Sequence, residues 1–262
     1  MEYTRIQFCV ENAVGQIVLN SPKNLNAFDE TMSDEMCAAL DAAMADESVK
    51  VIVISAEGKA FSAGGDIHEM VKGAQEDKVV FDVTAAKIAD VTKKIVTTPK
   101  PVIASVFGAV AGAAFNIAVA CDFCIAAENA KFIQAFVNIG LIPDAGGLFI
   151  LTRSLGISRA MQLAMLGTPV TAAEGKEMGF VYQVCAKEDL AAETAKLAAR
   201  LAAGPSTSYG LMKELVYTAQ FAGFEEYTAK EVQAQYRCGF THDFKEGVFA
   251  FTEKRKPEFN GK

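Results

Sequence analysis

The chain has 262 residues, of which 51% are hydrophobic and 22% are charged, and its formal net charge is −7. This composition excludes a disordered or fibrous chain, and no apolar run reaches the ~18 residues needed to span a bilayer. The negative charge argues against a nucleic-acid surface, because phosphate binding needs a basic face. We therefore expect no nucleic-acid and no membrane partner. The N-terminal segment lacks the cationic-then-apolar pattern of a secretory signal, which favours a cytoplasmic location.

The first half of the chain alternates short β-branched runs with helical patterns, which is typical of an α/β core. We expect strands at residues 16–20, 51–55, 102–106 and 123–126. The run 51–55 is apolar on both faces, as in a sheet covered on both sides. Methionine and leucine recur every four residues between the first two strands, and Asp29 precedes them as a candidate N-cap. A second helical pattern runs from about Thr84 to Val96.

The pattern changes after about residue 187, where no further strand of similar strength is predicted. Helical patterns cover residues 189–203, 206–220, 224–238 and 244–251. The sequence Gly204-Pro205 and Gly223 separate them. We therefore predict an α/β core at residues 1–187, which holds the substrate site, and a helical C-terminal part at residues 188–262.

Two glycine-containing turns follow two of the predicted strands. One is Lys59–Ile67, with Gly64 and Gly65 at its centre, and the other is Gly108–Asn116, which opens an apolar helix of small residues. Small residues let a ligand approach the backbone, and a helix N-terminus exposes unpaired N–H groups. Two such turns at the ends of neighbouring strands can direct two N–H groups at one oxygen, as in an oxyanion hole. Taken alone, each turn is also explained by close packing.

A third candidate feature is the glycine-rich loop at residues 140–147, which contains Asp144. If this carboxyl group is buried, its charged form is disfavoured and its pKa rises. A carboxyl group of that kind can carry a proton near neutral pH. The alternative is that Asp144 caps the helix predicted at residues 148–155.

Six segments in the expected order resemble the enoyl-CoA hydratase/isomerase (crotonase) family: residues 19–28, 60–67, 100–104, 120–122, 140–147 and 253–257. The resemblance covers nearly the whole chain. It implies an α/β fold that is a spiral of β-β-α units, with a helical C-terminal part used in the contacts of a homotrimer or a hexamer. It also implies an acyl-CoA substrate, with coenzyme A as part of the substrate and no separate cofactor.

The resemblance also assigns roles to individual residues. It places the oxyanion hole at the backbone N–H groups of Gly65 and Ala113, and the working acid at Asp144. Hydratases of the family carry two glutamates, and the matching positions here hold Asn116 and Phe136. Neither side chain can act as a carboxylate base. Phe136 would help to exclude water, and Asn116 is either a hydrogen-bonding group for substrate or water or a structural residue in the site wall.

The same resemblance places contacts with coenzyme A in two segments of the first half of the chain and at the C-terminus: Lys23, Asn24, Leu25, Ala63, Asp66, Ile67 and Lys254. Lys254 belongs to the only dense basic run, residues 254–256. The alternative interpretation of this run is a solvated tail that binds no ligand.

The predicted reaction shifts the double bond of an enoyl-CoA from C3 to C2 (Δ3-Δ2 type), with Asp144 as the single proton shuttle that takes a proton from C2 and delivers it to C4. The alternatives are hydration or another acyl-CoA lyase or hydrolase reaction, or acyl-CoA binding without turnover. A further alternative is that Asp144 is a nucleophile, as in the aryl-CoA dehalogenases of the family, which this chain resembles at the same loop. That resemblance also implies a histidine in the helix after the first turn and a tryptophan near the substrate, but residues 84–96 hold no histidine and the chain holds no tryptophan. An apolar pocket is suggested by five phenylalanines, although such residues mostly build cores: Phe107, Phe115, Phe132, Phe136 and Phe149.

Metal and histidine chemistry have little support in the sequence. Cys121 and Cys124 have a metal-like spacing, but no second cysteine pair or nearby histidine completes four ligands. We therefore expect no metal site, and we expect the six cysteines to be buried thiols and not disulfides. His68 is interpreted as a surface or helix-start residue.

Overall fold

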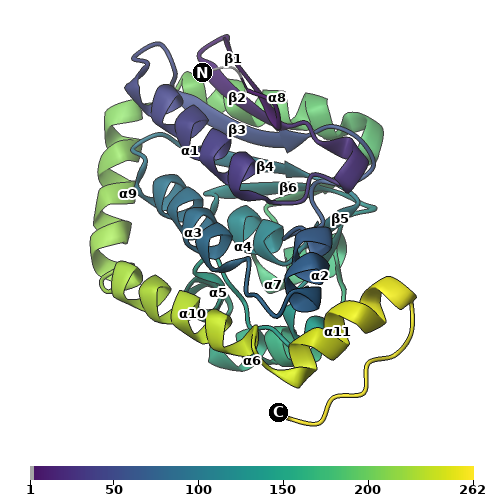
Figure 1. The fold of residues 1–262 in the computed structure, drawn as a ribbon. Coiled ribbons are helices and arrows are strands. Elements are labelled where there is room, and N and C mark those ends of the chain that lie inside the picture. The colour runs from purple at the N-terminus through teal and green to yellow at the C-terminus, as the bar shows by residue number, and fades with distance from the viewer. Residues whose placement is uncertain (1–2) are drawn as a thin grey trace.

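The structure, a computed structural model, describes residues 3–262 and contains a main sheet of six strands (Figure 1). The strand order is β1 (Ile6–Glu11), β2 (Val14–Leu19), β3 (Val51–Ala56), β4 (Val102–Val106), β6 (Phe123–Ala127) and β9 (Gln183–Cys185). The pair β1 and β2 is antiparallel, and the later pairings are parallel. The four expected strands are confirmed, with bounds that differ by at most two residues.

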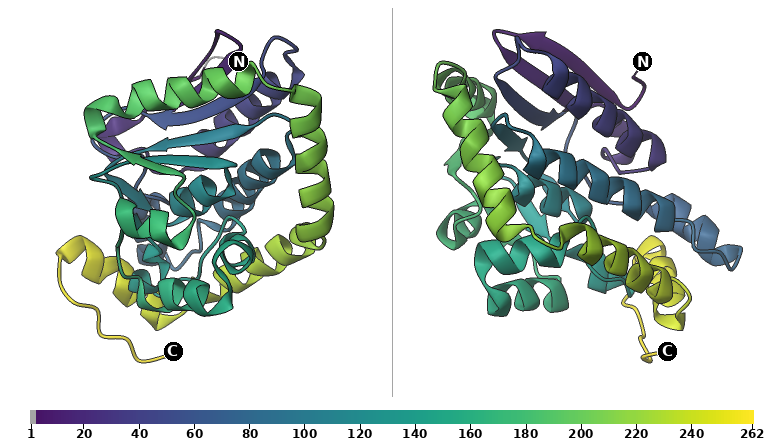
Figure 2. Two further views of the ribbon diagram at one scale, coloured as in Figure 1. Left: turned by 180° about the vertical axis from the view of Figure 1, so that it is seen from behind. Right: turned by 90° about the vertical axis from the view of Figure 1, so that its left-hand side faces the viewer.

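Both faces of the main sheet are covered by helices. Ile52 and Ile54 of β3 pack in one cluster with two long helices, whereas Val51 and Val53 point to the opposite face and pack in another cluster. The alternation follows from the two-residue period of a strand. The helices are α1 (Glu30–Ala45) and α3 (Asp82–Thr97) on the first face and α8 (Leu190–Ala202) on the second. Figure 2 shows α8 lying across the back of the sheet, so the expectation of two covered faces is confirmed.

A second sheet of three strands lies beyond the carboxyl end of β4. It contains β5 (Ala109–Ala111), β7 (Lys131–Ile133) and β8 (Val170–Thr171). The sequence predicted that the turn after β4 leads directly into a helix, and this was incomplete. The short strand β5 precedes α4 (Ala113–Ala120) and pairs with β7. Three residues are too few to show a strand period, so this pairing is fixed only by the tertiary structure.

The remaining elements connect these sheets. The helices among them are α2 (Ile67–Gln75), α5 (Gly147–Leu155), α6 (Ile157–Leu166) and α7 (Ala172–Met178). Short 3₁₀ helices lie at Pro22–Asn24, Ala135–Ile139 and Lys187–Asp189. Helices α2 and α5 begin directly after two of the loops that the sequence singled out.

The C-terminal helices are α8, α9 (Ser206–Gln220), α10 (Phe224–Cys238) and α11 (His242–Glu253), which confirms the four predicted helices to within two residues. Figure 1 shows α9 running down one side of the molecule and α10 and α11 along its lower edge. Because α8 packs on the main sheet, it shares a core with residues before 187. The division at residue 187 stays a prediction, and residues 1–2 of the predicted core lie outside the described residues.

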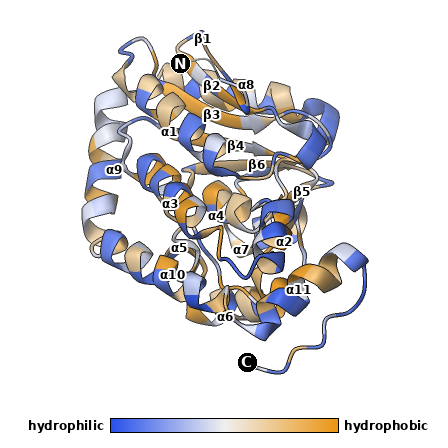
Figure 3. Ribbon diagram, in the orientation of Figure 1, coloured by the Kyte–Doolittle hydropathy of each residue, from blue (hydrophilic) through white to orange (hydrophobic). Residues whose placement is uncertain are grey.

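Helix α9 carries apolar side chains that the single chain leaves uncovered. Leu211, Met212, Leu215 and Val216 are all more than half exposed. In Figure 3 the strands of the main sheet are largely hydrophobic, whereas α9 carries both hydrophobic and hydrophilic residues. Exposed apolar patches mark interaction sites, so α9 agrees with the predicted homotrimer or hexamer, which stays a prediction. Within residues 3–262, no helix has the length and hydrophobicity needed to cross a bilayer.

Asp29 is the N-cap of α1, as predicted. Its Oδ1 accepts the backbone N–H of Met32 at 2.6 Å, and its Oδ2 lies 2.8 Å from the guanidinium of Arg5. Replacing an N-cap of this kind by alanine costs about 1 kcal/mol. We expect Asp29→Ala to lower the free energy of unfolding by at least that amount in urea titrations. Asp29→Asn keeps the capping acceptor and should lose less; equal losses in the two variants would contradict the capping role.

Candidate active site

The two glycine-containing turns are hydrogen-bonded to each other. The Ser62 amide donates to the carbonyl of Ala109 at 3.1 Å, and the Ala111 amide donates to the carbonyl of Ser62 at 3.1 Å. Gly64 has a φ of +90°, and a Cβ atom there would lie 2.8 Å from the carbonyl oxygen of Ala111. Only glycine permits this approach of the two backbones. The parallel neighbours β3 and β4 therefore bring the turns together, as the sequence predicted.

Two backbone N–H groups at this junction have no partner. Ala113 is the first residue of α4, and its helical position leaves its amide without an intrahelical acceptor. No hydrogen bond in residues 3–262 uses the amide of Ala113 or that of Gly65. Both donors are thus free for a ligand oxygen, as an oxyanion hole requires.

Asp144 lies in the loop before α5 and is buried. Burial raises the pKa of its carboxyl group to about 7. Its Oδ1 is fully enclosed and has no hydrogen-bond partner among the described residues. The N-cap of α5 is Gly146, without a side-chain cap, so the alternative that Asp144 caps this helix is wrong.

A small cavity joins Asp144 to the first turn. Its free volume is about 20 Å³, space for about one water molecule. The side chain of Met70 covers Gly65, because a Cβ atom on Gly65 would lie 2.7 Å from the Met70 Cε. The lining consists of Phe28, Gly65, Asp66, Glu69, Met70, Phe81, Thr84, Ala85, Ile88, Asp144 and Gln235. An acyl group therefore enters only if side chains of α2 and α3 move.

Asn116 is fully buried on α4, and both polar atoms of its side-chain amide form hydrogen bonds within the protein. Its Nδ2 donates to the carbonyl of Asp144 at 2.8 Å, and its Oδ1 accepts from Nε2 of Gln134 at 2.7 Å. A Cβ atom on Gly147 would lie 2.3 Å from the Asn116 Nδ2, so the glycine makes room for this contact. Of the two roles left open by the sequence, these contacts favour the structural one.

The five phenylalanines suggested as a pocket lining do not form one. Phe115 and Phe132 pack with Phe180 in the main core, and Phe107 packs under α8. Phe149 packs with Phe224 in a separate cluster. Phe136 lies against the second turn, because a Cβ atom on Gly112 would be 3.5 Å from its ring. Composition marks phenylalanines as core residues but does not show which core they join.

The residues predicted to contact coenzyme A lie together at the first turn, with one exception. The Ala63 amide donates to the carbonyl of Leu25 at 3.0 Å, and the Asn24 side chain donates to Oδ2 of Asp66 at 3.5 Å. Lys23 lies beside Asn24 in the 3₁₀ helix Pro22–Asn24, and Ile67 begins α2 after its N-cap, Asp66. No hydrogen bond in the described chain links Lys254 to this group. The CoA contacts stay a prediction.

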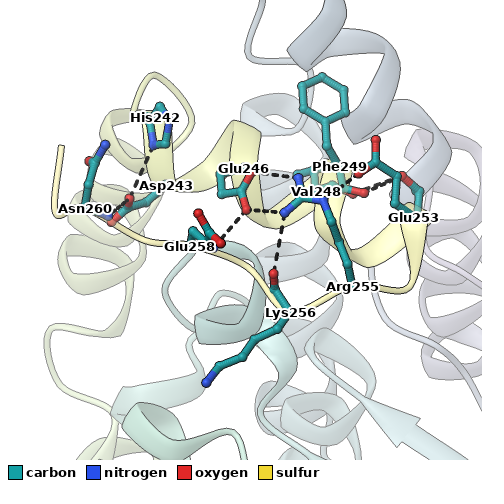
Figure 4. A network of polar contacts seen from close by, with 11 residues as sticks. His242, Asp243, Glu246, Val248, Phe249, Glu253, Arg255, Lys256, Glu258 and Asn260 are labelled. Carbon is teal, nitrogen blue, oxygen red and sulfur yellow. Dashed lines mark hydrogen bonds and ion pairs between the residues drawn. The ribbon is translucent and has the colours of Figure 1, made fainter.

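The C-terminal basic run is partly occupied within the chain. Figure 4 shows the guanidinium of Arg255 between Glu246 and Glu253, with distances of 2.8 Å to Oε2 of Glu246 and 2.6 Å to Oε2 of Glu253. Lys254 ends α11 in the left-handed conformation and is exposed. Arg255 therefore fixes the tail, whereas the exposed side chain of Lys254 has no hydrogen bond or ion pair within residues 3–262.

Sequence reasoning missed two buried polar residues of α10 beside the Asp144 loop. Oε1 of Glu231 accepts the amide of Gly146 at 2.8 Å, and Oε1 of Gln235 accepts the amide of Ile142 at 3.0 Å. Burial, with a smaller contribution from Asp144, raises the pKa of Glu231 to about 8. The available signal was spacing: Phe224, Glu231 and Gln235 are seven and four residues apart, which places them on one helix face.

The cysteine pair and His68 contribute nothing to this site. Cys121 is buried and its thiol donates to the carbonyl of Ile117, while Cys124 is buried within β6. All six cysteines are free thiols, but the expectation that they are buried is wrong for the other four, of which Cys9 is exposed at the edge strand β1. Residues 3–262 contain no group of three or more metal-ligating side chains. His68 is an exposed residue in the first turn of α2, as predicted.

The buried Asp144 makes stability depend on pH. Its pKa is raised from 3.8 to about 7, so the folded state holds a proton that the unfolded state releases, and stability falls as pH rises through this window. At 1.36 kcal/mol per pH unit this amounts to about 4 kcal/mol. We expect the wild type to lose about that much stability relative to Asp144→Asn between pH 4 and pH 8, measured by urea unfolding. Parallel pH profiles for the two proteins would contradict the burial of an ionisable group.

Comparison with known proteins supports the family that the sequence resemblance indicates. A family model described as enoyl-CoA hydratase/isomerase matches residues 10–262. The chain is 47% identical over 263 residues to the trans-2-decenoyl-[acyl-carrier-protein] isomerase of Streptococcus mutans, with 100% of both chains covered. It is 34% identical over 254 residues to the 1,2-epoxyphenylacetyl-CoA isomerase of Escherichia coli, with 97% of each covered. The crystal structure of an enoyl-CoA hydratase from Mycobacterium avium subsp. paratuberculosis is similar, with a TM-score of 0.89, 31% identity, and coverage of 99% of this chain and 100% of that one.

The chain therefore belongs to the enoyl-CoA hydratase/isomerase family and is an enzyme of that family. The crotonase-like α/β fold with a helical C-terminal region is confirmed. The reaction within the family is a separate question, because the names of the relatives include both isomerases and hydratases.

Proposed function

We propose that this protein is an isomerase that moves the double bond of an enoyl thioester between C2–C3 and C3–C4 without adding water. The observation that carries the proposal is Asp144, a buried carboxyl group with an unpartnered oxygen, in one cavity with Gly65. Asn116 and Phe136 stand where the resemblance places the two glutamates of a hydratase. A relative at 47% identity is named as an isomerase, which agrees with this choice.

The proposed mechanism uses one carboxyl group for both proton transfers. With a 2-enoyl thioester, the Asp144 carboxylate removes a proton from C4, and the electron pair moves through the double bond to the thioester oxygen. The N–H groups of Gly65 and Ala113 hold the oxygen of this dienolate. Asp144 then returns the proton to C2, so atoms and charge balance without a co-reactant. A pKa of about 7 lets the same group accept and donate a proton near neutral pH.

Exclusion of water is the second requirement of this mechanism, because a water molecule beside the conjugated double bond would allow addition. Phe136 is buried, and its ring lies against Gly112 at the start of α4. Met70 covers Gly65 from α2. Met70 also lines the cavity at Asp144, whose volume of about 20 Å³ holds no more than about one water molecule.

We further propose that the substrate is a medium-chain 2-enoyl group on a phosphopantetheine thioester. Acyl carrier protein and coenzyme A present the acyl group on this same arm, and the relative from Streptococcus mutans is named for a ten-carbon group on the carrier protein. The turn Ala63–Ile67 contains Gly65, and the turn Lys23–Leu25 is hydrogen-bonded to it. These two turns are the proposed contacts of the arm, with Lys254 as a further contact. A comparison of the two thioesters decides which carrier is preferred.

Hydration is the second candidate, and one observation favours it. Glu69 lines the same cavity as Asp144, so two carboxyl groups border it, although Glu69 is exposed at the rim. Burial, followed by the charges of Asp66 and Asp29, raises the pKa of Glu69. The geometry supports hydration less well, because Glu69 faces solvent.

The test uses trans-2-decenoyl thioesters of acyl carrier protein and of coenzyme A with the purified protein. We expect loss of the conjugated thioester absorbance and formation of the 3-enoyl isomer, resolved by chromatography against authentic standards. A 3-hydroxyacyl product would contradict the proposal and establish hydration. Tight binding of both thioesters without turnover would contradict it in favour of a binding protein.

A further inference from the structure

Helix α10 is hydrogen-bonded to both ends of the loop that carries Asp144. Gln235 accepts the amide of Ile142 at 3.0 Å, and Glu231 accepts the amide of Gly146 at 2.8 Å. The two acceptors are four residues apart on one face of α10, and the two donors are four residues apart on either side of Asp144. One rigid helix thus sets the distance between the ends of the loop.

Both acceptors are buried, with exposed fractions of 4% for Glu231 and 1% for Gln235. Burial raises the pKa of Glu231 to about 8, so the group is largely uncharged near neutral pH. A carbonyl oxygen of an uncharged carboxyl group still accepts an amide N–H. The contact with Gly146 therefore depends on an acceptor at this place and not on a negative charge.

A third contact, from a different helix, holds the middle of the loop. Asn116 of α4 donates to the carbonyl of Asp144 at 2.8 Å. The loop needs such support, because Ala145 has a φ of +58° and a non-glycine residue in this region costs energy unless its surroundings hold it there. The backbone on both sides of Asp144 is fixed, while Oδ1 of its carboxyl group has no hydrogen-bond partner within residues 3–262.

We propose that Glu231 and Gln235 are positioning residues, which clamp the loop Ile142–Gly146 and so fix the direction in which the Asp144 carboxyl group enters the cavity. This inference rests on the proposed isomerase function. Displacement of a reacting group by about 1 Å costs on the order of 100-fold in rate. The clamp acts on the orientation of Asp144 and not on thioester binding, so its loss should lower kcat and leave KM nearly unchanged.

The experiment compares Glu231→Leu, which removes the acceptor, with Glu231→Gln, which keeps an oxygen at the same place. We expect kcat to fall on the order of 10- to 100-fold in Glu231→Leu, with KM within about threefold of the wild type. Glu231→Gln should restore kcat to within about threefold. Glu226→Gln is the matched control, because Glu226 lies on the same helix with an exposed side chain paired to Lys230. Gln235→Leu tests the contact at the other end of the loop, and it replaces Glu231→Leu in the comparison if that variant does not fold.

A second readout separates this inference from the proposed function. Amide hydrogen exchange over residues 141–148 needs no substrate, and it should be faster in Glu231→Leu and Gln235→Leu than in Glu231→Gln. If the wild-type protein shows no isomerase activity but exchange is faster in Glu231→Leu and Gln235→Leu, the result would support the clamp and reject the proposed function. Unchanged kcat and unchanged exchange in a folded Glu231→Leu would overturn the clamp, as would a Glu231→Gln variant as impaired as Glu231→Leu.

Discussion

Replacing Asp144 by asparagine is expected to lower kcat for double-bond isomerisation by about 10²- to 10⁴-fold, the usual contribution of a general acid–base residue. Asparagine has nearly the same shape but neither accepts nor returns a proton. The carbonyl of residue 144 that Asn116 binds is unaffected, so the loop should keep its conformation. The rate is measured by the change in conjugated thioester absorbance.

The control for this variant is Asp90→Asn, which changes an exposed aspartate on α3 in the same way. It should retain full activity. Thioester affinity in Asp144→Asn should stay close to that of the wild type, because no binding contact is removed. Retention of more than a tenth of the wild-type kcat in Asp144→Asn would contradict the role of Asp144 as the proton shuttle.

Removing the amide of Ala113 is expected to have the second largest effect. Proline lacks an N–H and is tolerated at the first position of a helix, which is the position of Ala113 in α4. Loss of one oxyanion-hole donor costs about 10²- to 10³-fold in kcat. We expect Ala113→Pro to show a loss of that size while remaining folded by circular dichroism.

The matched variant is Ala113→Gly, which keeps the amide and removes only the methyl group. It should stay within a few-fold of the wild-type rate, since the donor acts through the backbone. Equal losses in Ala113→Pro and Ala113→Gly would assign the effect to packing. Full activity in a folded Ala113→Pro would remove Ala113 from the oxyanion hole.

The sequence predicts the main sheet and its helices well, because their patterns are local and periodic. The run 51–55 is apolar on both faces, which predicts that helices cover both sides of this strand. Asp29 is a typical N-cap residue, which predicts the start of α1. The small sheet was missed, since its strands have two or three residues and no period to detect. Boundaries of the long helices followed from glycine and proline residues between them.

The candidate site was predicted in part, and the missing part depends on contacts distant in the sequence. Asp144 and the two turns lie in glycine-containing segments that each have a structural explanation when taken alone, and it is the family resemblance that joins them into one site. Glu231 lies 85 residues from Gly146, so only the folded chain shows that its carboxyl group holds this loop. Asn116 had two readings, and its contact with the Asp144 carbonyl is what separates them.

The measurement that tests the central claim most directly is the mass of the product formed from a trans-2-decenoyl thioester. If Asp144 moves a proton between C4 and C2 in a site closed to water, the product is an isomer with the mass of the substrate and a displaced double bond. This is the result we expect. A product heavier by the mass of one water molecule would show that the site adds water, and it would contradict the account of Asp144 as a shuttle for isomerisation.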